Sequence, residues 1–245
     1  MTTGERHHRA QGAVRAKAKR VIADTWQSQA NLSFFLAILV AFAFIFPILG
    51  FGRKDIKFYA DVAFTFLLIS GVAIAWGHKF QLLISGSVAG IAIVCRWVNW
   101  FAPRPTLQLW ADSWSLAAIV IIAFVLLAQV FQPGRVTHVR LQGAIAAYLL
   151  FGAGYAHAYH MVAVLQPGAF NTTAGLMSNV SDWVYFSFIT LTTVGYGDIT
   201  PVNQTARELS VAEALTGQLY LAVLVARLVA MEVVSWQESK NNSGS

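Results

Sequence analysis

The residues best suited to chemistry in this sequence form the run Thr192-Thr-Val-Gly-Tyr-Gly-Asp198. Gly195 and Gly197 can adopt backbone angles that are closed to other residues, so successive carbonyl oxygens can all point toward one axis. Four such segments would make a ladder of oxygen rings, and rings of this kind can replace the hydration shell of a potassium ion. The hydroxyl of Thr193 can add the innermost ring. This run therefore predicts cation selection by backbone oxygens and not by charged side chains.

A short helix is predicted directly before this run, from Ser181 to Thr190. Ser181 or Asp182 can cap its N-terminus, and about ten residues are too few to cross a bilayer. The aligned peptide dipoles place partial negative charge at its C-terminus, which would favour a cation near the membrane centre. The segment is interpreted as a re-entrant pore helix.

The composition places the chain in lipid. Of its 245 residues, 57% are hydrophobic and 11% are charged, whereas about a quarter are charged in a soluble domain. The mean hydropathy is +0.58. The net charge of +6 comes from basic residues that cluster before the first apolar run and in connectors, which argues against nucleic acid as a partner.

Six apolar runs are long enough to cross a hydrocarbon core, which needs about 20 residues per helix. The predicted fold class is an all-α membrane protein with six transmembrane helices per subunit, and with the pore helix and filter between helices 5 and 6. Each span should be helical, because lipid cannot hydrogen-bond to exposed backbone. The predicted spans are 32–51, 58–76, 80–101, 114–131, 141–165 and 209–234.

Basic residues upstream of the first span predict a cytoplasmic N-terminus, and six spans then return the C-terminus to the same side. The chain is expected in the plasma (inner) membrane as a multi-pass protein. Arg53, Lys54 and Lys57 fall outside and oppose this orientation. Residues 11–29 are either an amphipathic helix against the lipids of the inner leaflet or a partly disordered basic tail.

The stretch from Tyr185 to Pro201 closely resembles the pore signature of the potassium channel superfamily. The resemblance implies a potassium filter made by Thr193, Val194, Gly195, Tyr196 and Gly197, with the side chains of Val194 and Tyr196 packed backward against the pore helix. It also implies a homotetramer.

The resemblance covers the fifth span through the sixth, and the front four spans only by their number. The apolar runs and their connectors divide the chain into five parts. A basic N-terminal segment at 1–31 is followed by a four-helix, voltage-sensor-like domain at 32–132, a connector at 133–140, a pore domain at 141–234 and a short cytoplasmic tail at 235–245. The tail is too short to fold a ligand-binding domain. Potassium is the only metal expected, with no other cofactor.

Tyr185, Phe186, Thr192 and Asp198 are the residues expected to support the filter. Many potassium channels carry two tryptophans where this sequence has Tyr185 and Phe186. Phe186 cannot donate a hydrogen bond to Tyr196, whereas the Tyr185 hydroxyl can reach Asp198. Ile189 stands where some bacterial channels carry a glutamate, so the filter is expected to be held by packing more than by buried charge.

The last span carries the candidate gating residues. Gly217 lies where the family's inner helix has a hinge, although a small residue there can also serve close helix packing. Glu213 is expected to meet a pore-helix hydroxyl or outer water. Arg227 is expected to reach inner headgroups or a neighbouring subunit. A stripe formed by Leu221, Val225, Val229 and Val233 either lines the lower cavity as a hydrophobic gate or packs helix against helix.

Two histidines, His157 and His160, lie near the outer end of the fifth span. They could titrate near neutral pH and sense external protons, or they could simply form hydrogen bonds at the interface. In the front half, Asp61 and Arg96 either pair with each other or face water.

These features predict a potassium-selective channel subunit that is not strongly voltage-gated, because residues 114–132 contain no Lys or Arg to act as gating charges. A non-selective cation channel is one alternative, and a non-conducting membrane sensor or scaffold is another. The sequence shows no nucleophile grouped with a base, so an enzyme is not predicted. The gating stimulus and any swapping of the front domain between subunits stay open.

Overall fold

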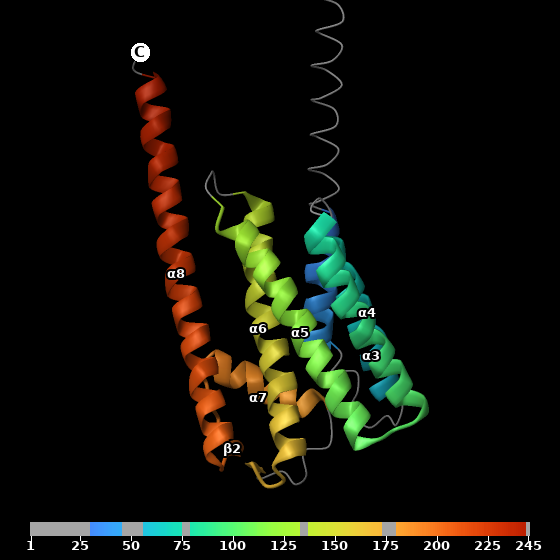
Figure 1. The fold of residues 1–245 in the computed structure, drawn as a ribbon. Helices are drawn as coiled ribbons and strands as arrows, with labels where there is room; N and C mark the ends of the chain where they lie inside the picture. The colour runs from blue at the N-terminus through green and yellow to red at the C-terminus, as the bar shows by residue number, and fades with distance from the viewer. Residues whose placement is uncertain (1–29, 46–55, 75–78, 133–136, 173–179, 244–245) are drawn as a thin grey trace, which may run out of the picture.

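The computed structural model describes residues 30–45, 56–74, 79–132, 137–172 and 180–243. The predicted basic segment at 1–31 lies almost entirely outside the described residues, as do Arg53 and Lys54. The chain is a bundle of long helices with one short helix lying across it (Figure 1).

The front of the bundle contains an apolar helix at Ala30–Ile45, which ends in a π-helical turn, η1 (Ala41–Ile45). It is followed by α3 (Ile56–Ile74), α4 (Lys79–Phe101) and α5 (Pro105–Val130). Helix α5 begins well before the predicted start of the fourth span at Trp114. Pro105 suits a first helical turn because its missing N–H needs no partner there, whereas polar residues up to Ser113 interrupt the apolar run.

The rear of the bundle contains α6 (His138–Leu165), α7 (Val180–Leu191) and α8 (Gln204–Ser243). Thr137 caps α6, because its side chain accepts a hydrogen bond from the Arg140 N–H at 3.4 Å. Helix α7 is the predicted pore helix, and Asp182 lies in its first turn instead of at the N-cap. Helix α8 extends beyond the other helices and includes most of the predicted tail at 235–245 (Figure 1).

A small antiparallel ribbon joins β1 (Phe170–Thr172) to β2 (Ile199–Pro201), with Asn171 opposite Thr200. It ties the segment after α6 to the segment that follows the predicted filter. The predicted all-α class omits this ribbon, because strands of three residues are too short to show an alternating pattern in the sequence.

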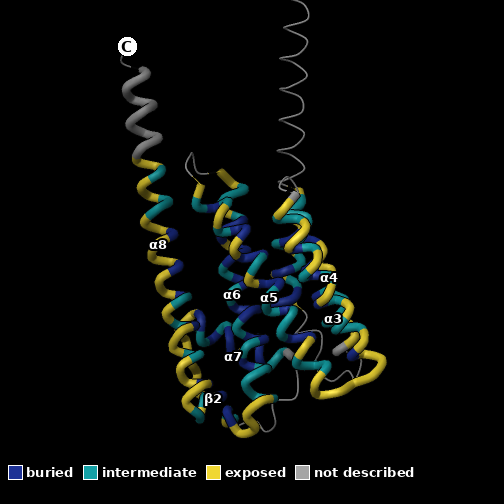
Figure 2. Tube along the Cα trace, viewed as in Figure 1, coloured by how far each residue is buried: buried dark blue, intermediate teal, exposed yellow. Residues whose placement is uncertain are grey.

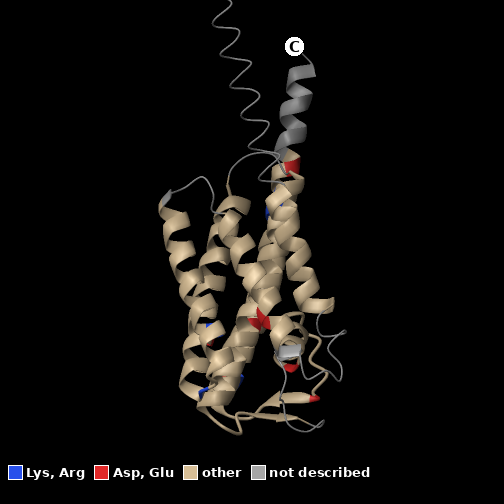
Figure 3. Cartoon of the chain, turned by 90° about the vertical axis from the view of Figure 1, so that its right-hand side faces the viewer, with Lys and Arg blue, Asp and Glu red and all other residues tan. Residues whose placement is uncertain are grey.

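The core centres on α5 and α6, with the front helices packed on α5 and with α7 packed on α6. Helix α8 is mostly exposed along its length (Figure 2). Small residues on α6, such as Ala144 and Ala147, are fully buried and allow neighbouring helices to approach closely. Figure 3 shows that charged residues are sparse along the described helices. On α8 the exposed fractions of Leu215 and Leu219 are 55% and 62%, so a broad apolar face lies open on the single chain.

Three described helices are long and apolar enough to cross a membrane: 80–101, 105–130 and 204–233. The helices at Ala30–Ile45 and Phe58–Ile74 are apolar but shorter. Helix α6 has 28 residues, but Gly, Tyr and His residues lower its hydropathy. The described structure thus shows three spans by length and composition, against the six predicted.

Candidate functional site

The pore helix ends in a left-handed turn that leads into the predicted filter. The N–H groups of Val194 and Gly195 both donate to the Ile189 carbonyl, at 2.9 and 3.0 Å, and the Thr193 N–H donates to the Thr190 carbonyl at 2.9 Å. Thr193 has a φ of 59° and is the only described non-glycine residue with positive φ. Glycine usually occupies this position of a helix C-terminus, so a β-branched residue here stores backbone strain.

This turn fixes the direction of the filter carbonyls. The described peptide bonds are all trans, and in a trans peptide the C=O points opposite to the N–H of the next residue. Because the N–H groups of Val194 and Gly195 point at the end of α7, the carbonyls of Thr193 and Val194 point away from it. Gly195 and Gly197 have φ values of 51° and 81°, in the region that favours glycine.

The filter side chains are largely exposed on the single chain. Val194 is 51% exposed and Tyr196 is 74% exposed. The resemblance implies that both pack backward against the pore helix, but the pore helix of the same chain covers them only in part. Thr192 is also exposed and donates to the Phe188 carbonyl at 2.6 Å.

The expected link between Tyr185 and Asp198 is present. The Tyr185 hydroxyl donates to Asp198 Oδ2 at 2.8 Å, and Asp198 Oδ1 accepts from the Ile199 N–H at 3.0 Å. Phe186 faces the other way and packs against Tyr159, with ring centroids 4.8 Å apart.

Glu213 meets a pore-helix hydroxyl, which confirms one of the two partners expected for it. Its side chain is fully buried and lies within hydrogen-bonding distance of Ser187 on α7. Tyr159 of α6 donates to its other oxygen at 2.5 Å. Glu213 therefore joins α8 to α7 and α6.

Gly217 lies against the end of the pore helix. A Cβ atom at this position would overlap the carbonyl oxygen of Leu191, and it would lie 3.1 Å from the Leu191 carbonyl carbon. The close-packing interpretation therefore holds at this position, and the hinge stays a prediction.

Replacing Gly217 by Ala is expected to destabilise the fold by roughly 1–3 kcal/mol, because a backbone carbonyl cannot give way as a flexible side chain can. Thermal unfolding in detergent measures the loss. Gly90 on α4 is the matched control, since a Cβ there would meet nothing within 4 Å. Gly90→Ala should be neutral or gain about 0.5–1 kcal/mol. Equal melting temperatures for the two variants would contradict the close contact.

Gln218, which the sequence interpretation missed, contacts the filter directly. Its side-chain Nε2 donates to Thr193 Oγ1 at 3.2 Å. This bond holds the hydroxyl expected to form the innermost oxygen ring, at the residue with the strained backbone. The sequence did contain a signal for this contact: Gln218 is an amide side chain inside an apolar span, and polar groups at membrane depth need hydrogen-bond partners.

Arg227 contacts the end of α5 in the described chain, a placement that the sequence did not indicate, and its contact with headgroups or a neighbouring subunit stays a prediction. It donates to the carbonyl oxygen of Phe131, and its guanidinium carbon lies 4.9 Å from the Phe131 ring centre. Phe131 is the C-cap of α5, where unpaired carbonyls carry partial negative charge that attracts a cation.

The four residues of the stripe on α8 are half exposed on the single chain, which suits both pore lining and contact with another helix. The exposed fractions are 44% for Leu221, 58% for Val225, 58% for Val229 and 51% for Val233.

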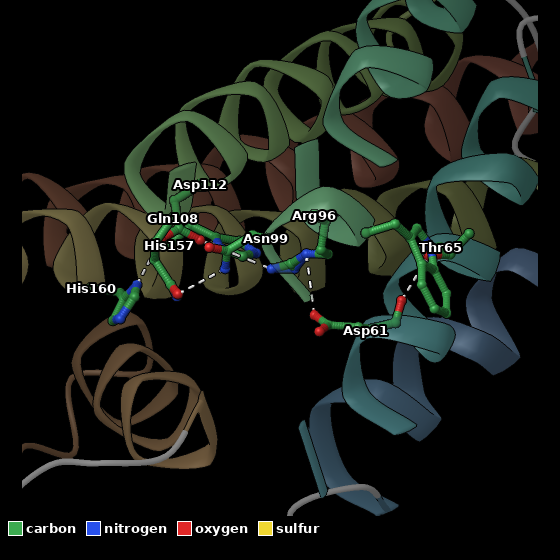
Figure 4. Close-up of polar contacts among 9 residues, drawn as sticks. Asp61, Thr65, Arg96, Asn99, Gln108, Asp112, His157 and His160 are labelled. Carbon is green, nitrogen blue, oxygen red and sulfur yellow. Dashed lines mark hydrogen bonds and ion pairs between the residues drawn. The ribbon is translucent and has the colours of Figure 1, made fainter. Parts of the chain in front are cut away.

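A polar network connects the front helices to α6 (Figure 4). Asp112 of α5 lies at its centre, with Oδ2 2.8 Å from His160 Nδ1 and Oδ1 3.4 Å from His157 Nδ1. Arg96 of α4 approaches Asp112 Oδ1 at 3.9 Å and Asp61 Oδ1 of α3 at 3.4 Å. The pairing of Asp61 with Arg96 is thus confirmed. The two histidines share one carboxylate, and proton sensing by them stays a prediction.

Comparison with known proteins bears on the rear half of the chain. Residues 144–233 match the family model described as an ion channel. The "Two pore potassium channel c" of Oryza sativa subsp. japonica is 34% identical over 99 residues, which cover 40% of this chain and 20% of that protein. "Protein LctB" of Bacillus caldotenax is 37% identical over 87 residues, which cover 34% of this chain and 64% of that protein.

"Two-pore potassium channel 4" of Arabidopsis thaliana is 43% identical over 58 residues, which cover 24% of this chain and 20% of that protein. The chain thus spans less than two thirds of each of these relatives. No solved structure matches the chain significantly.

Proposed function

We propose, from the premise that residues 144–233 belong to the potassium channel superfamily, that this chain is one subunit of a potassium-selective channel. Four copies would surround one axis, and each would contribute residues 193–197 to a common filter. Potassium would pass through it down its electrochemical gradient. The chain would need no cofactor beyond the ions themselves.

The orientation of the Thr193 and Val194 carbonyls is the observation that carries this proposal. Both point away from the pore helix, because the N–H groups of the same peptides are bonded to the Ile189 carbonyl. Four copies arranged with these carbonyls inward would present stacked oxygen rings to a dehydrated cation. The left-handed φ angles of Gly195 and Gly197 support continuation of the ladder.

The membrane arrangement proposed with this function has six spans and both termini in the cytoplasm. It places the pore domain at 141–234 behind a front domain at 32–132 and the connector at 133–140. Within the lipid-embedded tetramer, the exposed apolar face of α8 would contact neighbouring subunits or line the cavity below the filter. The half-exposed stripe on α8 supports this placement.

Weak voltage dependence is part of the proposal. Helix α5 carries neither Lys nor Arg from Pro105 to Val130, and its one ionisable group, Asp112, is buried against two histidines. A membrane potential acts on charges that can move. Because Asp112 is held in place by these contacts, a change in membrane potential would move little charge on α5.

Ion flux from liposomes loaded with potassium chloride tests the function. Liposomes that contain the purified protein should release potassium readily into a potassium- and sodium-free medium when a protonophore lets protons enter in exchange. Liposomes loaded with sodium chloride instead should release sodium far more slowly. Comparable sodium and potassium flux would instead identify a non-selective cation channel. Absence of flux under all voltages and pH values would favour a sensor or scaffold.

A further inference from the structure

We propose that Glu213 is held in the protein as a neutral carboxylic acid, and that its proton links the inner helix to the pore helix through Ser187. Glu213 is then a positioning residue for the filter. Only the consequence for the filter rests on the proposed channel function. The protonation itself follows from the hydrogen bonds in the described chain.

Counting hydrogens around Ser187 gives the first argument. The Ser187 hydroxyl has one hydrogen but lies within hydrogen-bonding distance of two oxygens, the Gly152 carbonyl at 2.7 Å and Glu213 Oε1. A carbonyl and an ionised carboxylate can both only accept, so the single Ser187 hydrogen cannot form a full hydrogen bond to each of them. We assign this hydrogen to the Gly152 carbonyl. The contact with Glu213 is then a hydrogen bond only if the carboxyl group supplies the hydrogen.

The second oxygen of Glu213 fits the same assignment. Glu213 Oε2 accepts from the Tyr159 hydroxyl at 2.5 Å. An acid with its hydrogen on Oε1 and a free acceptor on Oε2 satisfies Tyr159, Ser187 and Gly152 together. An ionised Glu213 would have to share the single Ser187 hydrogen with the Gly152 carbonyl, whereas a neutral acid brings a hydrogen of its own to this contact.

The surroundings of Glu213 offer little to stabilise a negative charge. Its side chain is 0% exposed, and no described Lys, Arg or His forms an ion pair with it. The titratable groups that α6 brings to this region are phenols: Tyr159 on the carboxyl itself, Tyr155 bonded to Thr216, and Tyr148 donating to Leu191. From α7 the contact is Ser187, which does not titrate. A buried carboxylate without a cation is costly, whereas a neutral acid is not.

The position of the bond explains what the proton does. Ser187 lies in the middle of α7, where the Phe188 ring packs so closely on α6 that a Cβ at Gly152 would approach it to 2.7 Å. The C-terminal end of α7 is pressed against Gly217 of α8. The hydrogen bond made by the Glu213 proton therefore links α8 to the middle of α7. The C-terminal end of α7 in turn sets the direction of the carbonyls in the proposed filter.

A comparison of Glu213→Gln with Glu213→Ala tests the proposal at neutral pH. A glutamine amide can donate to Ser187 and accept from Tyr159, so it reproduces the neutral acid. We expect Glu213→Gln to keep the melting temperature of the wild type and potassium flux within about twofold, and Glu213→Ala to lose about tenfold in flux. If Glu213→Gln loses as much flux or stability as Glu213→Ala, the negative charge is required and the proposal is wrong.

Infrared spectroscopy gives a readout that does not depend on conduction. The wild type at neutral pH should show a protonated carboxyl C=O band that Glu213→Gln lacks and that Ser187→Ala retains at a shifted frequency. Absence of this band from the wild type would overturn the proposal. A band present in a protein that conducts no potassium would support the protonation while counting against the channel function, so the two failures are distinguishable.

Discussion

Replacing Gly195 by Ala is expected to abolish potassium-selective flux while the protein stays folded. The φ of Gly195 is 51°, and a Cβ there would meet nothing within 4 Å in the single chain. The penalty therefore comes from the backbone, at about 1–2 kcal/mol for an L-residue in the left-handed region. Relief of this strain rotates the adjoining peptides, and their carbonyls leave the common axis. In the proposed tetramer every subunit would carry the change, so all four positions of one oxygen ring would be disturbed together.

Gly168 provides the matched control for this experiment. Its φ is 84°, a Cβ there would also meet nothing within 4 Å, and it lies in the loop after α6, outside the filter. Gly168→Ala should lose a similar amount of thermal stability and keep the potassium-to-sodium flux ratio of the wild type. Selective flux through Gly195→Ala, or loss of selectivity in both variants, would contradict the role assigned to residues 193–197.

Replacing Asp112 by Ala is expected to lower the free energy of unfolding by about 3–5 kcal/mol, the usual effect of removing one partner of a buried ion pair. Asp112 is 2% exposed and joins α5 to Arg96 of α4 and to both histidines of α6. Without it, Asp61 is the one carboxylate left beside Arg96 among the described residues, and the two histidines lose the acceptor that they share.

Denaturation in detergent, followed by tryptophan fluorescence, measures the effect of Asp112→Ala. Ser113→Ala is the control, because the hydrogen bond of the Ser113 hydroxyl in the described structure goes to the Leu109 carbonyl one turn earlier in the same helix. The control should change stability by less than about 0.5 kcal/mol. A similar small change for Asp112→Ala would show that the network contributes no stability.

The sequence was most informative where a local pattern forces a structure. The short helix at α7, the glycine angles and the bond between Tyr185 and Asp198 follow from residues that are close in the chain. The buried partner of Glu213 was also predictable, because an acid at membrane depth needs a donor and the pore helix supplies hydroxyls.

Other contacts depend on packing between distant segments and left no local pattern. Asp112 lies 48 positions from His160, and Arg227 lies 96 positions from Phe131. The predicted fourth span began at Trp114, so Asp112 was placed outside it and its part in the network was missed. The β1–β2 ribbon was missed for a similar reason, because its strands pair across the whole pore-helix segment.

The bond between Arg227 and Phe131 gives α8 the geometry of a lever. The Gly217 contact with Leu191 serves as a fulcrum, and Arg227 lies ten residues further along, about 15 Å at 1.5 Å per residue. A 1 Å displacement of the end of α5 would turn α8 about this fulcrum by roughly 4° on that length. Helix α8 continues beyond Arg227, so its C-terminal end would move further than the end of α5 that displaces it. A small movement of the end of α5 would thereby be enlarged at the far end of α8.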